Sequence, residues 1–132
     1  MEFRYFQPNP QGRNTGDCVI RAICKATGMG WYDVYTALCV QGYSLADWGD
    51  SNAVWSAWLI SQGFHRATIP DTCPACYTIA DFCADHPQGV YIVCTGKHVV
   101  CVIDGVLYDS WHSEYEIPTY YFYRQNMRMN GA

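Results

Sequence analysis

Apolar residues recur at helical spacing through the first two-thirds of the chain and form short continuous runs in the last third. The helical pattern and its stop signals predict four helices, over residues 18–27, 31–40, 51–63 and 78–84. The apolar runs predict four strands, over residues 90–94, 98–103, 106–111 and 117–123. This order predicts an α+β fold, in which N-terminal helices pack on a C-terminal antiparallel sheet.

The dipeptide Asp104-Gly105 lies between two of the predicted strands and is typical of a two-residue hairpin turn. With this turn, Ile103 faces Val106 and Val100 faces Asp109. Because side chains alternate between the faces of a strand, His98 and Asp109 then project from the same face as diagonal neighbours. Their backbones are expected about 7–8 Å apart, a gap that two side chains can close.

Cys18 follows the small-residue segment Asn14-Thr15-Gly16-Asp17 and opens the first predicted helix. The free N–H groups and the dipole at a helix N-terminus favour a thiolate, although the adjacent Asp17 opposes it unless its charge caps the helix. A thiol, then His98, then Asp109 is the order that thiol-dependent acyl transfer uses. Asn14 is the candidate side-chain donor to an oxyanion, with Gln11 behind it.

These motifs resemble the papain-like cysteine peptidase superfamily: Gly16-Asp17-Cys18 opening a helix, His98-Val99-Val100 on a strand, and Tyr108-Asp109 on the next. The similarity is strongest to the compact bacterial type that cleaves double-glycine leader peptides, and to small papain-like proteins of phages and mobile elements. The resemblance implies a papain-like fold with Cys18 as nucleophile, His98 as base and Asp109 as third member. The family's oxyanion glutamine corresponds to Gly12 here, and Val19 stands where a glycine often follows the cysteine.

Composition favours one globular domain over residues 1–132, with a core from about 8 to 123 and a short flexible C-terminal tail. The net charge of −4 and the scattered basic residues argue against nucleic acid as a partner. No apolar run is long enough to cross a membrane, and the first residues lack a signal-peptide pattern, so a cytoplasmic location is expected. For a phage-encoded chain this means the host cytoplasm. The expected partner is a peptide or protein substrate, with no cofactor.

Eight cysteines in a cytoplasmic protein are expected to stay reduced, and packing in the core is the ordinary role for Cys24, Cys39, Cys94 and Cys101. A competing hypothesis is a zinc site, for which the spacing of one CxxC and one CxxH motif offers Cys73, Cys76, Cys83 and His86. We predict no metal, because the segment between the motifs has an apolar helical pattern that limits folding back. His112 is a weaker alternative base.

The sequence thus favours a cysteine-dependent hydrolase that cleaves a peptide, isopeptide or other amide bond. Two alternatives stay open. An acyltransferase or transglutaminase-like enzyme would use the same residues with an amine as acceptor, and a non-catalytic papain-like module would bind or inhibit a partner. Trp31, Trp48 and Trp111 could line a groove beside the site, whereas Trp55 and Trp58 are expected to fill the core.

Overall fold

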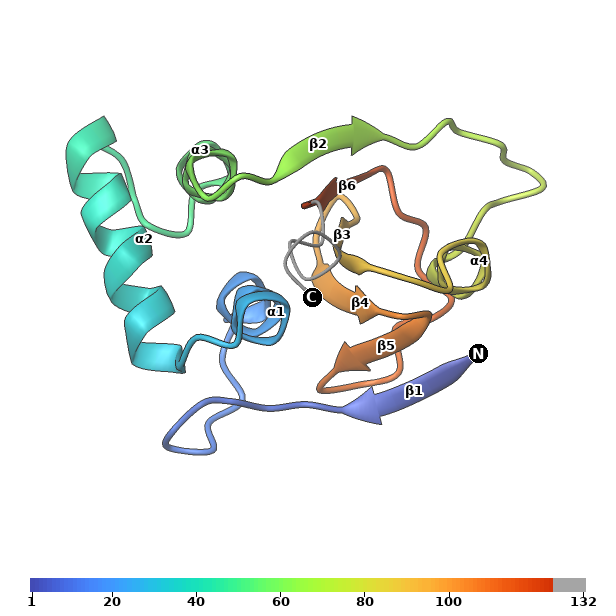
Figure 1. Ribbon diagram of the computed structural model, residues 1–132, viewed down its shortest axis with the longest axis horizontal. Coiled ribbons are helices and arrows are strands. Elements are labelled where there is room, and N and C mark those ends of the chain that lie inside the picture. Colours follow the sequence, from blue (N-terminus) through green and yellow to red (C-terminus); the bar gives the residue numbers. More distant parts are fainter. Residues whose placement is uncertain (125–132) are drawn as a thin grey trace, which may run out of the picture.

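The computed structural model describes residues 1–124, so the tail expected at the C-terminus lies almost entirely outside the described residues. Four helices and six strands form within this range (Figure 1). The helices are α1 (Cys18–Thr27), α2 (Trp31–Leu45), α3 (Asn52–Ser61) and α4 (Ile79–Asp85). The strands are β1 (Glu2–Tyr5), β2 (His65–Thr68), β3 (Val90–Cys94), β4 (Val99–Ile103), β5 (Val106–Asp109) and β6 (Tyr120–Tyr123). The fold is α+β.

The strands form one sheet in the order β1-β5-β4-β3-β6-β2. The β1 strand runs parallel to β5, whereas the other neighbouring pairs are antiparallel. The sheet is therefore mixed, which corrects the prediction of a purely antiparallel, C-terminal sheet. Both strands missing from the prediction, β1 and β2, are short edge strands with mostly exposed residues, so neither shows the alternation of a half-buried strand.

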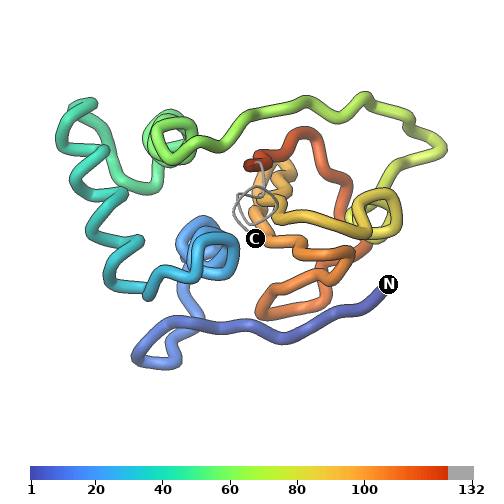
Figure 2. Tube along the Cα trace, viewed as in Figure 1, coloured from blue at the N-terminus to red at the C-terminus, as the bar shows by residue number. Residues whose placement is uncertain are grey.

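Helices cover both faces of the sheet, as the chain trace in Figure 2 also shows. On one face, α1 lies between the sheet and α2, and Ile23, Trp55 and Phe122 are buried at the centre of this core. On the opposite face, Phe82 of α4 packs with Val100 and its neighbours in a second, smaller core. The helix that begins with Cys18 is thereby held against β4.

The hairpin between β4 and β5 forms as predicted. Ile103 pairs with Val106, and Asp104 and Gly105 have positive φ angles of 51° and 76°. This is the left-handed backbone that a tight hairpin turn requires at both central positions. The register brings His98 and Asp109 to one face of the sheet.

The ends of several predicted elements differ from the structure. The α1 helix matches its prediction, whereas α2 continues past residue 40 and ends where Ala46 takes a left-handed conformation. The α4 helix begins after Thr78, whose side chain accepts a hydrogen bond from the Asp81 N–H in a reciprocal capping box. Among the described residues, no helix is long and apolar enough to cross a membrane.

Candidate active site

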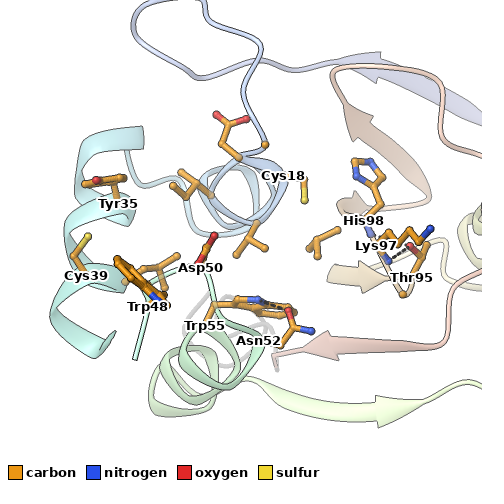
Figure 3. Close-up of a pocket in the computed structure, with 18 of the residues that line it drawn as sticks. Cys18, Tyr35, Cys39, Trp48, Asp50, Asn52, Trp55, Thr95, Lys97 and His98 are labelled. Atoms are coloured by element: carbon orange, nitrogen blue, oxygen red, sulfur yellow. Dashed lines mark hydrogen bonds between the residues drawn. The ribbon is translucent and has the colours of Figure 1, made fainter. Parts of the chain in front are cut away.

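Three different elements carry the predicted catalytic residues. Cys18 is the first residue of α1, His98 directly precedes β4, and Asp109 ends β5. The turn before β4 holds His98 in place, because its backbone N–H donates to Thr95 Oγ1 at 2.9 Å and its carbonyl accepts from the Thr95 N–H at 2.8 Å. In Figure 3 the Cys18 side chain lies on the side of α1 that faces His98.

The imidazole of His98 lies between the thiol and the carboxylate. Its Nε2 lies 2.7 Å from Oδ2 of Asp109, which leaves the other ring nitrogen, Nδ1, for an interaction with the nearby Cys18 thiol. Neighbouring serines also hold Asp109: Ser113 Oγ donates to Oδ2 at 2.6 Å, and the Ser110 N–H donates to Oδ1 at 2.7 Å. The carboxylate is therefore fixed, and it orients the ring toward the thiol.

The electrostatics of the pair favour charge separation. Burial by itself raises the pKa of the Cys18 thiol, but hydrogen bonds with His98 and the Val99 N–H, together with the positive charges of His98 and Arg21, outweigh it and lower this pKa. Burial acts to lower the pKa of His98, yet its bonds to Asp109 and Cys18 raise that pKa to about 9. Together these shifts favour a thiolate–imidazolium pair near neutral pH.

Arg21 is a functional candidate that the sequence prediction missed. One guanidinium nitrogen lies 3.0 Å from Asp17 Oδ1, another lies 3.1 Å from Asp109 Oδ1, and all three side chains are buried. The Trp31 indole N–H donates to the other oxygen of Asp17 at 2.9 Å. Asp17 and Arg21 stand four residues apart on one helical face. This spacing is the sequence signal that could have predicted their ion pair.

The same network compensates the negative charge of Asp17, which lies next to Cys18. The side chain of Asp17 makes no capping hydrogen bond to α1, contrary to the expected use of its charge. The ion pair with Arg21 and the bond from Trp31 neutralise it instead. The thiol is thus protected from the full effect of the adjacent carboxylate.

Cys18 and His98 open onto a cavity of about 550 Å³. One wall consists of α1, α2 and the segment that leads into α3, and the other consists of the turn before β4 together with Tyr120 (Figure 3). Trp48 lines this cavity and is 81% exposed, as the predicted groove requires, whereas Trp55 lies beneath it in the core. Trp111 lies against the His98 ring, with 4.8 Å between the ring centroids.

The predicted oxyanion donor does not reach this cavity. Asn14 and Gln11 are exposed in the loop before α1, and neither side chain lines the cavity that contains Cys18. The loop makes its own turn, in which Asn9 Oδ1 accepts from the N–H groups of Gln11 and Arg13. Backbone N–H groups in the first turn of α1 are the donors that remain close to the thiol.

The remaining cysteines are mostly unsuited to nucleophilic chemistry. Burial raises the pKa of Cys24 and Cys83 to about 11 and that of Cys94 to about 12. Cys101 is fully buried, and its pKa is also raised. Cys39 differs from the prediction of core packing, because it is exposed on α2, where it lines the cavity wall. Any test of Cys18 must therefore separate it from Cys39.

The four residues of the alternative zinc site do not come together. Cys73 and Cys76 form a disulfide, which corrects the expectation that all cysteines stay reduced; their short loop brings the Cα atoms to 4.1 Å. Cys83 is buried in the second core, and His86 Nδ1 bonds the Phe82 carbonyl at 2.8 Å. Within residues 1–124, no group of three His, Cys, Asp or Glu side chains could hold a metal ion.

The other candidate base, His112, lies away from the thiol. Its ring stacks on Phe3, with 4.0 Å between centroids, and its Nδ1 lies 3.2 Å from Glu114. His112 is therefore a matched control for His98 in experiments.

No protein-family model matches the chain, and it has no match among the curated proteins or the solved structures. The fold and site define an α+β protein in which a cysteine, a histidine and an aspartate meet beside a cavity.

Proposed function

We propose that this protein is a papain-like, cysteine-dependent hydrolase of peptide, isopeptide or other amide bonds. The observation that carries the proposal is the arrangement of three side chains: the Cys18 thiol lies beside the His98 ring, and this ring bonds the buried Asp109 carboxylate. A helix N-terminus supplies the thiol, and the lowered pKa of Cys18 with the raised pKa of His98 is the pattern of an activated nucleophile.

The proposed reaction follows from these positions. The Cys18 thiolate attacks the carbonyl carbon of the amide, and N–H groups of the first turn of α1 stabilise the negative oxygen. His98 then gives its proton to the leaving nitrogen as the C–N bond breaks, which leaves a thioester on Cys18. Water attacks the thioester carbonyl as it gives a proton to His98, and the C–S bond then breaks, which releases the carboxylic acid and restores the thiolate–imidazolium pair.

The same thioester could instead be attacked by an amine, which is the acyltransferase alternative. The open cavity beside Cys18 has room for either acceptor. A non-catalytic module would form no thioester.

Acyl transfer from p-nitrophenyl acetate tests the proposal without knowledge of the natural substrate. We expect a burst of p-nitrophenolate, one acetyl group on Cys18 by peptide mass spectrometry, and slow turnover to acetate. The H98A variant should lose the burst, because the thiol no longer has its base and its imidazolium partner. The H112A variant should keep it.

Each outcome separates the functions. Acetate release with a burst supports a hydrolase, whereas acetyl transfer to added glycinamide in preference to water supports the acyltransferase. A protein that shows no acetyl group on Cys18, or equal acetylation in H98A, contradicts the catalytic proposal and favours a binding module.

A further inference from the structure

One wall of the cavity belongs to a long segment without positive charge. Between Lys25 and Arg66 the chain contains no lysine or arginine, while Asp33, Asp47 and Asp50 carry negative charges. This segment includes α2, α3 and the loop between them. Asp50 is the aspartate of this segment that lines the cavity, on the wall opposite Lys97.

The same wall exposes large aromatic side chains. Tyr35, Cys39 and Tyr43 follow one another at four-residue intervals on α2 and so share one face of the helix. Tyr43 is 90% exposed and Trp48 is 81% exposed. We call the set Tyr35, Cys39, Tyr43, Asp47, Trp48 and Asp50 the α2 rim. An exposed aromatic surface of this kind, continuous with a cavity, marks an interaction site.

The α2 rim reaches the candidate nucleophile. Tyr35, Cys39, Trp48 and Asp50 line the same cavity as Cys18, and Figure 3 shows Asp50 and Trp48 on the helix side of it. Lys97 lies on the opposite wall, beside His98. A positive group in the cavity would be repelled by Lys97 and attracted by Asp50. The cavity therefore has a negative charge on the wall with Asp50 and a positive charge on the wall with Lys97.

We infer that the α2 rim binds a basic segment of the polypeptide on which Cys18 acts. The inference rests on the proposed function and names its substrate class: chains with lysine or arginine near the scissile bond, interspersed with apolar residues. Aromatic faces attract ammonium and guanidinium groups, and nearby carboxylates add to this attraction. An acidic peptide would meet repulsion on this wall.

A second copy of the chain does not supply the complementary surface. Five of the eight basic residues are already engaged within the fold: Arg4 with Glu2, Arg21 with Asp17 and Asp109, Lys25 over Phe6 and Tyr108, Arg66 over Tyr120, and Arg124 over Phe64. Within residues 1–124 this leaves Arg13 and Lys97. An anionic membrane surface is disfavoured by the rim's carboxylates.

Binding by the C18A variant, which cannot form a thioester, tests the inference. Three fluorescein-labelled peptides of equal length share their apolar residues and differ in carrying lysine, glutamine or glutamate at the alternate positions. Fluorescence anisotropy should show tightest binding for the lysine peptide, with affinity that falls as salt rises. In the C18A background, D50K and W48A should each weaken this binding about tenfold. E116K, which makes the same charge change at an exposed site in the loop before β6, should not.

The results distinguish this inference from the proposed function. Acetylation of Cys18 by p-nitrophenyl acetate needs no peptide, so the burst of the parent protein and of E116K, whose substitution lies outside the cavity, reports on the proposed function alone. Equal binding of the three peptides, or equal loss in D50K and E116K, overturns the basic-substrate inference even where the burst is normal. Binding of anionic vesicles in preference to the lysine peptide, or concentration-dependent dimers that W48A abolishes, also overturns it.

Discussion

Arg21 and Asp109 stand 88 positions apart in the sequence, yet they form a buried ion pair with 3.1 Å between Nη2 and Oδ1. The pair joins the helix that carries the candidate nucleophile to the strand that carries the carboxylate that orients His98. The same guanidinium holds Asp17, the residue before Cys18. Arg21 is thus a positioning residue that fixes both ends of the site.

Removal of Arg21 should destabilise the fold. The R21M variant leaves two buried carboxylates without their shared cation, and breaking a buried pair in this way costs about 3–5 kcal/mol. Urea denaturation measures the change in the free energy of unfolding. R21K should recover part of the loss, because it keeps the charge but cannot bridge two carboxylates with a planar fork. An R21M protein as stable as the parent would contradict the role assigned to Arg21.

Neutralisation of Asp109 should lower the pKa of His98. The bond to Asp109 is the largest cause that raises this pKa to about 9, and burial, which lowers it, stays in place in D109N. Titration of the His98 ring signals by NMR measures the shift directly. His112, whose ring bonds Glu114, makes no contact with Asp109 and serves as the control residue. A His98 pKa that is unaffected in D109N would show that the carboxylate does not control the ring.

Protonation of His98 should stabilise the folded protein over a defined pH range. The pKa of His98 is about 9 in the fold and 6.5 in an unperturbed chain, so the folded state holds the proton more tightly. The resulting stabilisation is complete below pH 6.5 and is lost as the pH rises through about 9. The difference in unfolding free energy between the parent and H98Q should shrink across this range. A difference that stays constant or grows with pH would contradict the assigned shift.

The sequence alone predicted those parts of the fold whose backbone geometry depends on residues close together in the chain. A two-residue turn at Asp104-Gly105 fixes the parity of the strands that it joins, and this alone brings His98 and Asp109 to the same face. The α1 helix also follows from local signals, with its left-handed stop at Gly28.

The parts that the sequence did not predict depend on contacts between distant segments. The β1 strand forms because it can pair in parallel with β5, and its mostly exposed residues carry no pattern that requires this. The pairing of Arg21 with Asp109 depends on how α1 packs against the sheet. Asn14 is exposed outside the cavity, in a loop whose turn is held by the contacts of Asn9 with Gln11 and Arg13.

The pH dependence of Cys18 alkylation tests the central claim most directly. Iodoacetamide is applied to the C39S variant, which removes the competing exposed thiol, and modification of Cys18 is followed by mass spectrometry. We expect Cys18 to be alkylated rapidly already at neutral pH. The alkylation rate should change a second time near pH 9, where His98 loses its proton. In C39S/H98A the imidazolium is absent, while burial still raises the pKa of Cys18. Alkylation of Cys18 should therefore become fast only above pH 9, and at neutral pH it should be slower by about tenfold or more. Superimposable pH profiles for the two proteins would show that Cys18 and His98 do not form a catalytic pair.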